Sequence, residues 1–160
     1  MQKPASLRKA LTAALPELRN EPDRLSLWVE DGSVRTRQTA AQGFAFEYPL
    51  SVLLREVKTD IAIAVHAINR WLRIHQPDLM AAHQAASYKF ETDILDEGSA
   101  DILFTLQLTE AVAIADAEGG AWSIEYQAEP NPLLTDDEAV DEAAGTPPLA
   151  GVTVEDIVAS

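Results

Sequence analysis

The residues most capable of chemistry in this chain are its three histidines, which lie close together in the sequence. His66, His75 and His83 fall within the 18 positions of HAINRWLRIHQPDLMAAH. Two metal ligands on one helix share a face when they are three or four residues apart, whereas His66 and His75 are nine apart (75 − 66 = 9). At about 100° per residue they lie on opposite sides of a helix. The spacing therefore argues against a shared metal site.

Each histidine also has a structural interpretation. His66 falls on a polar face together with Asn69 and Arg70, which is typical of a solvated side chain. His75 falls in the apolar stripe near the end of the same helix, where an imidazole packs or satisfies a carbonyl. His83 follows Pro77 and lies beyond the helix.

No other pattern in the sequence is typical of a catalytic site. The chain has no cysteine, which excludes disulfides and thiolate chemistry, and it contains no GxSxG turn and no glycine-rich phosphate loop. The acids Asp93, Asp96, Glu97 and Asp101 lack the alternating ligands of a calcium loop and are typical of a turn with solvated carboxylates. We therefore expect no catalytic residue, no metal and no cofactor, and we interpret the chain as a protein other than an enzyme.

The first elements are predicted from apolar spacing and turn residues. A helix near the N-terminus is indicated by leucines at helical spacing, with Ser6 as its cap and Pro16 ending or kinking it near Leu15. Alternating apolar residues from Leu25 to Val29, followed by Asp31-Gly32, predict a hairpin with a two-residue turn. The run from Phe44 to Leu54 has an apolar residue at every second position, which is the strongest strand signal in the chain. Pro49 cannot donate to a ladder, so we expect that strand to be an edge or bulged there.

The second half predicts a helix over residues 60–76, capped by Asp60 and ended by Pro77. Strands follow over 88–95, 100–115 and 121–127, with turns at 96–98 and 118–120. In the middle strand one face is apolar: Ile102, Phe104, Leu106, Leu108, Val112 and Ile114. The order helix, three strands, helix, then three or more strands predicts a single α+β domain, with two main helices packed on a mixed or antiparallel sheet.

Composition divides the chain into a domain over residues 1–128 and an acidic tail over 129–160. The tail holds four prolines, eight acids, no base and no aromatic residue, which is typical of a disordered segment. No run approaches the ~18 apolar residues of a membrane span, and charges interrupt the apolar N-terminal pattern, so we expect neither a membrane segment nor a signal peptide. Without cysteines, a cytoplasmic location is the default expectation.

Charge is unevenly distributed along the chain. Residues 1–89 carry all 12 Lys+Arg and 9 acids, whereas residues 90–160 carry the other 17 acids and no base, so the two parts have net charges of +3 and −17. Nucleic-acid binders show a basic footprint instead, so binding to nucleic acid is not expected. Two interpretations remain: an acidic part that faces a basic part of a neighbouring subunit, or a tail that only keeps the protein soluble.

Four stretches, in this order, carry a resemblance to a known family: KPASLRKALTAALPELRNEPDRLSLWVEDGSV, FAFEYPLSVLL, WLRIHQPDLM and FETDILDEGSADILFTLQLTEAVAI. From about Lys3 to Gly120 the chain resembles the tail completion protein R family of P2-like contractile-tailed phages and prophages. The resemblance implies a structural protein of the virion tail, assembled in the bacterial host cytoplasm, which caps the tail tube and prepares it for joining to a head. Related phages do this with a ring of about six small α+β subunits.

The resemblance therefore implies a tail-terminator-like fold and three partners: further copies of the chain in a ring, the tail tube protein and the head–tail connector. A ring needs a head-to-tail interface between two different surfaces. We hypothesise that Arg35 and Arg37 in the second hairpin strand, or Arg70 and Arg73 on the second helix, meet acids of the neighbouring copy.

The segment containing Trp71, Gln76 and Asp78 carries much of the resemblance and has two interpretations. It is either the end of a helix in which Trp71 covers the core, or a contact with the tube or connector. Two further functions stay open for the chain: an adaptor on the head side of the head–tail junction, and an enzyme of unrecognised type. Neighbouring genes for baseplate, tube and sheath would favour the tail, and genes for portal and capsid would favour the adaptor.

Overall fold

Two long strands form the centre of the fold, β3 (Phe44–Val57) and β5 (Ser99–Asp116). They pair antiparallel from Phe44 opposite Val112 to Val57 opposite Ala100, with one irregularity between Leu54 and Val57. The structure is a computed structural model that describes residues 1–81 and 85–129. The alternation from Phe44 to Leu54 was a correct predictor, because every second side chain from Tyr48 to Leu54 is buried.

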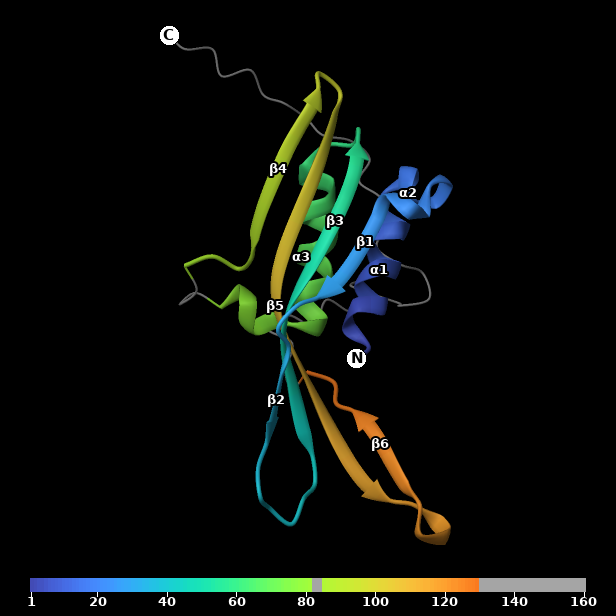
Figure 1. Ribbon diagram of the computed structural model, residues 1–160, viewed down its shortest axis with the longest axis vertical. Coiled ribbons are helices and arrows are strands. Elements are labelled where there is room, and N and C mark those ends of the chain that lie inside the picture. The colour runs from blue at the N-terminus through green and yellow to red at the C-terminus, as the bar shows by residue number, and fades with distance from the viewer. Residues whose placement is uncertain (82–84, 130–160) are drawn as a thin grey trace.

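The shorter strands flank this pair on both sides. β1 (Leu25–Val29) and β2 (Ser33–Thr36) both pair with β3, whereas β4 (Lys89–Asp96) and β6 (Trp122–Tyr126) both pair with β5. All these pairings are antiparallel. Their registers place β1 and β4 beside one half of the central pair, and β2 and β6 beside the other half. Figure 1 shows β2 and β6 at the far end of the molecule from β4.

The predicted hairpin between residues 25 and 36 is wrong. β1 and β2 do not pair with each other; they follow one another along the same side of β3. Val29 faces Leu50 and Ser33 faces Glu47, so three residues, 30–32, lie opposite two, and Asp31 takes a positive φ of 52°. Asp31-Gly32 therefore makes a bulge in a continuing strand direction instead of a reversal. Pro49 lies beside this bulge, where β3 has no partner on that side, while its pairing with Gln107 of β5 is regular.

Helices cover the half of the sheet that carries β1 and β4 (Figure 1). They are α1 (Lys3–Ala14), α2 (Pro16–Asn20) and α3 (Ile61–His75), with short 3₁₀ turns at Pro22–Arg24, Pro77–Met80 and Glu118–Gly120. α1 packs against α3, and both bury their apolar stripes toward the sheet. The α+β class and the predicted element order are confirmed.

Of the two predicted helix caps, the one at the start of α3 is correct and the one at the start of α1 is not. The Asp60 side chain accepts a hydrogen bond from Ala62 N at 2.7 Å, which confirms it as the cap of α3. The predicted cap at Ser6 is wrong, because α1 begins at Lys3 and Ser6 lies inside the helix. Pro4 occupies the first turn of α1, where a missing N–H costs nothing, and Pro16 separates α1 from α2 as predicted.

Beyond the helices, the central strands continue as an arm with no α-helix beside it (Figure 1). The arm is defined here as β2, β6 and the parts of β3 and β5 that pair with them, residues 44–47 and 112–116. The cross-strand partners of β2 and β6 show that the core face of the sheet continues along the arm. Large apolar side chains on that face stay exposed: Val34 at 60 %, Trp122 at 57 % and Ile124 at 63 %. The arm therefore presents an apolar face that the described part of the chain does not cover.

Replacement of Asp60 by alanine is expected to destabilise the fold by about 1 kcal/mol, because the first-turn N–H of Ala62 loses its acceptor. The free energy of unfolding in urea measures this. Asp23→Ala is the matched control, since Asp23 is an exposed acid in a short turn, and its loss should stay within about 0.5 kcal/mol. Equal losses in the two variants would contradict the cap.

Candidate functional site

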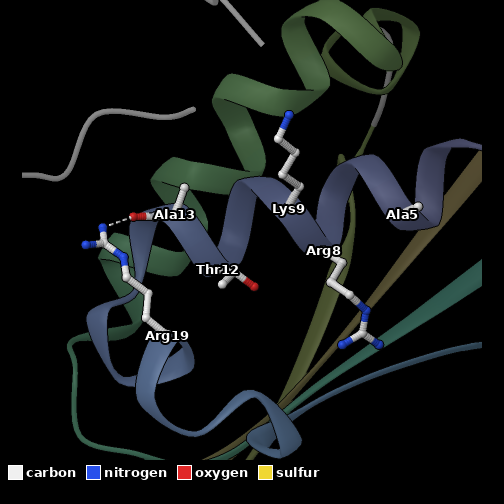
Figure 2. A pocket seen from close by; sticks show the side chains of 6 residues that line it. All are labelled: Ala5, Arg8, Lys9, Thr12, Ala13 and Arg19. Carbon is white, nitrogen blue, oxygen red and sulfur yellow. Dashed lines mark hydrogen bonds between the residues drawn. The ribbon is translucent and has the colours of Figure 1, made fainter. Parts of the chain in front are cut away.

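A hollow on the surface of α1 and α2 gathers basic side chains. It is lined by Ala5, Arg8, Lys9, Thr12, Ala13 and Arg19. Figure 2 shows Arg8 and Lys9 pointing in different directions from α1, whereas Arg19 of α2 reaches back to the Ala13 carbonyl at the end of α1. Arg8 donates to Leu25 O and Arg19 donates to Ala13 O, so both guanidinium groups are already held by backbone carbonyls. The hollow is therefore a basic surface and not a converging ligand site.

A buried polar cluster joins the two layers where the helix-covered half of the sheet ends. We define it as Lys3, Tyr48, Gln76, Thr109 and Glu110. The Lys3 ammonium donates to Gln76 Oε1 at 2.7 Å, to Thr109 O at 2.5 Å and to Glu129 Oε1 at 2.7 Å. Gln76 Oε1 also accepts from Thr109 N at 2.9 Å. One lysine thus ties α1 to the end of α3, to β5 and to Glu129.

Glu110 is the second centre of this cluster and is only 3 % exposed. Its carboxylate accepts from Gln2 N at 2.6 Å and from the Tyr48 hydroxyl. Burial, followed by the hydrogen bond to Glu110, raises the pKa of Tyr48 well above its ordinary value. Burial also raises the pKa of Tyr88 to about 12. The Tyr88 hydroxyl lies outside this cluster and donates to Asn69 Oδ1 at 2.8 Å. Tyr48 and Tyr88 also line a surface hollow of about 540 Å³, together with Asp78 and Gln107.

The predicted interface arginines fall in two separate places. Arg35 and Arg37 lie on and just after β2 in the arm, and both are exposed. Arg35 pairs with Glu47 of β3 in the same chain, whereas Arg37 has no ion pair in the described part of the chain. Arg70 and Arg73 are half-buried on α3 and make contacts of their own within the chain.

The predicted segment from Trp71 to Asp78 folds around the end of α3. Trp71 is 4 % exposed, donates from Nε1 to Ser6 Oγ at 3.0 Å and stacks on His75 with ring centroids 4.8 Å apart. Gln76 is buried in the polar cluster and donates from Nε2 to Asp78 Oδ1 at 2.5 Å. Asp78 itself is exposed. Gln76 and Asp78 are therefore brought together, but the arm arginines lie elsewhere.

The histidines do not converge in the described structure. His75 packs on Trp71, and its Nε2 lies 3.4 Å from Ser6 Oγ. His66 is half-buried on α3, although we expected a fully solvated side chain. His83 lies outside the described residues. Within residues 1–81 and 85–129, no three histidines, cysteines or acids stand close enough to hold a metal. No helix in those residues is long and apolar enough to cross a membrane.

Free strand edges are a further accessible feature. β4 pairs only with β5 and β2 pairs only with β3, so each has an outer edge without a partner among the described strands. All eight residues of β4 and all four of β2 are exposed. An exposed edge presents unpaired N–H and C=O groups that another strand can use. Such edges suit association with a protein surface better than chemistry on a small molecule.

Sequence reasoning missed the polar cluster. Glu110 carried a signal, because it interrupts the apolar face of β5 between Leu108 and Val112 at an inward position. Lys3 carried none, since a lysine in a first helical turn is usually solvated and only the tertiary fold brings it to Gln76.

Comparison with known proteins gives two matches and one negative result. Residues 1–130 match the family described as P2 phage tail completion protein R (GpR). The chain is 34 % identical over 134 residues to the tail completion protein R of Escherichia phage P2, covering 82 % of this chain and 86 % of that protein. No solved structure matches the chain.

Replacement of Lys3 by methionine is expected to cost about 2 kcal/mol of folding free energy, because Gln76 and Glu129 lose the donor that satisfies them. Urea denaturation measures the loss. The control is Lys9→Met, an exposed lysine on the same helix, with an expected change within about 0.5 kcal/mol. If the two variants were equally stable, Lys3 would have no structural role in the cluster.

Stability is expected to fall in alkali because of Tyr48. Its pKa is raised in the folded state, so its contribution is fully present below about pH 10, the ordinary tyrosine value, and is lost as the pH rises through the folded value. Between these limits the unfolded chain ionises first, which costs up to roughly 1.4 kcal/mol per pH unit. Urea unfolding from pH 8 to 11 measures the slope, and Tyr48→Phe should make it shallower. An unchanged slope in Tyr48→Phe would assign the effect to other groups.

Proposed function

This chain belongs to the P2 phage tail completion protein R family, and from that premise we propose that it is a structural protein that completes a contractile phage tail. In this role it caps the tail tube and makes the tail competent to join a head. The observation that carries the proposal is the family match over residues 1–130, which includes every described helix and strand. The protein acts by binding and not by catalysis.

The surface of the fold supports a binding role. Its accessible features are free strand edges, a basic hollow on α1 and the apolar face of the arm. The conspicuous buried polar groups all have partners: Lys3 donates to Gln76, to Glu129 and to the backbone of Thr109, and Glu110 accepts from Tyr48 and from the backbone of Gln2. A protein that must dock between two larger bodies needs such surfaces, and a satisfied polar interior keeps them rigid.

We further propose that the working form is a head-to-tail ring of about six copies. Copies of one chain form such a ring when two different surfaces of each copy are complementary. The uneven charge of the sequence supports such complementarity, because the bases lie in residues 1–89 and the acids dominate residues 90–160. The other partners are then the tail tube protein and the head–tail connector, and the protein is located at the tail–head junction of the virion.

The purified chain is expected to bind the end of tail tubes from the phage that encodes it, if those tubes lack their own completion protein. Negative-stain images of tubes with the added chain should show density at one end only, and extracts containing such tubes and filled heads should gain infectious particles. Heads incubated alone with the chain are the control. Density on heads and none on tubes would replace the tail assignment by the head-side adaptor.

A further inference from the structure

Two edge strands of this chain have complementary patterns. β2 and β4 lie at opposite edges of the sheet, and both are exposed along their whole length. Ile94 on β4 is 74 % exposed and Val34 on β2 is 60 % exposed, which are high values for large apolar side chains. Isolated edges of this kind are sites of pairing with another chain unless charges oppose it.

The two faces of β2 differ in character. Val34 and Thr36 stand opposite Phe46 and Phe44 of β3, so they lie on the core face of the sheet. Arg35 stands opposite Ala45 and lies on the outer face, and Arg37, two residues further on, continues that side. β2 is therefore apolar or neutral on one face and basic on the other.

The two faces of β4 complement this arrangement. Phe90, Thr92 and Ile94 stand opposite Phe104, Ile102 and Ala100 of β5, so they lie on the core face. The residues between them, Glu91 and Asp93, lie on the outer face. The outer face of β4 is thus acidic where the outer face of β2 is basic.

We infer that β2 of one copy adds to the free edge of β4 of the next copy, so that the sheet continues from subunit to subunit. The directions agree: β2 runs against β3, β3 against β5 and β5 against β4, so a β2 strand laid beside β4 is antiparallel to it. The core faces of both copies then lie on the same side. This inference rests on the proposed ring, and it names the interface that holds the ring together.

Charge selects one register for this pairing. With Val34 opposite Ile94, Thr36 faces Thr92, and the two arginines, Arg35 and Arg37, face Asp93 and Glu91. A shift of two residues keeps the faces but only one of the two charge pairs. In one direction Arg35 faces Glu91 while Arg37 faces Lys89. In the other direction Arg37 faces Asp93, while Arg35 faces Leu95 and Val34 faces Asp96. Pairs of opposite charge and pairs of threonines across strands are favourable, whereas like charges directly opposite are not.

The existing bond of Arg35 is compatible with this register. Arg35 pairs with Glu47 of its own chain on the outer face, and its guanidinium group has five N–H donors. In the continued sheet it lies between Glu47 and the neighbour's Asp93. Arg37 and Glu91 have no ion pair in the described part of the chain, so their contact would be new.

The position of the edges makes successive copies staggered. β4 flanks residues 99–105 of β5, whereas β2 flanks the part of β3 that faces residues 109–112. Each added copy is therefore displaced along the strand direction. Strong tilt of the strands converts such a stagger into a closed ring, and without it the same contact would give an open filament.

Disulfide cross-linking tests the pairing directly, because the chain contains no cysteine. The variant Thr36→Cys/Thr92→Cys places the two thiols opposite each other in the inferred register, within the distance that a disulfide requires. Mild oxidation should give a ladder of covalent multimers that reductant removes. Thr36→Cys and Thr92→Cys alone are the controls and should give no ladder. A ladder from Thr36→Cys/Ile124→Cys in place of the first variant would overturn the inference and assign the interface to β6.

Charge exchange tests the register by a second route. Arg37→Glu and Glu91→Arg should each weaken self-association at least tenfold in light scattering across a range of concentrations, and the double variant should restore it. Failure of the double variant to associate better than either single variant overturns the register. If the free chain is a monomer, the same cross-link and exchange are measured on chain bound to tail tubes, and absence of the ladder there overturns the inference.

These outcomes separate the interface from the proposed function. Tube binding without the Thr36–Thr92 cross-link rejects the interface and keeps the tail assignment. Cross-linked multimers that bind no tube keep the interface and reject the assignment. Filaments in place of closed particles in negative-stain images keep the strand pairing and reject the ring.

Discussion

The pairing of β3 with β5 is the interaction on which the rest of the fold depends. Every other strand of the described chain attaches to one of these two, and the buried faces of α1 and α3 pack on the half where Tyr48 to Leu54 oppose Ile102 to Leu108. The two strands are longer than the helix layer that covers them, as Figure 1 shows. The excess length produces the arm, and the arm is the reason that the domain has four short flanking strands where a sheet of uniform length would have two.

This geometry leaves strand edges free, and a free edge can pair unspecifically with other chains as well as with a specific partner. Charged side chains on an edge strand oppose unspecific pairing. Here the edge charges differ in sign, since β2 carries Arg35 and β4 carries Glu91 and Asp93. Two copies of β4 repel each other and two copies of β2 do the same, whereas β2 and β4 attract. The same charges therefore disfavour the symmetric contacts and favour the head-to-tail contact that a ring requires.

Much of the fold could be predicted because its strongest signals are local. The alternation from Phe44 to Leu54 and the apolar stripe of α3 with its Asp60 cap are repeated over many residues, so tertiary contacts reinforce them. The hairpin at Asp31-Gly32 failed because its two residues suit a bulge as well as a reversal, and only the partner strand decides between them. Ser6 failed as a cap because Pro4 starts the helix earlier. The placement of Lys3 beside Gln76 and Thr109 depends on contacts across more than seventy residues (76 − 3 = 73), which no local pattern contains.

Glu110 has a role in the alignment of β3 and β5, because the apolar pattern of these strands does not by itself specify one register. A slip of β3 against β5 by one residue would turn every side chain to the wrong face, but a slip by two would keep the faces, because apolar residues follow one another at alternate positions on both strands. Glu110 removes this ambiguity, since it is the one charged residue among the inward positions from Ile102 to Val112. In the observed register it meets Tyr48 and the backbone of Gln2 at the end of the helix layer. A slip that moved it under the helices would bury an unpaired carboxylate at a cost of several kcal/mol. A buried polar group can therefore decide the alignment of the two central strands, and with it the position of the strands that flank them.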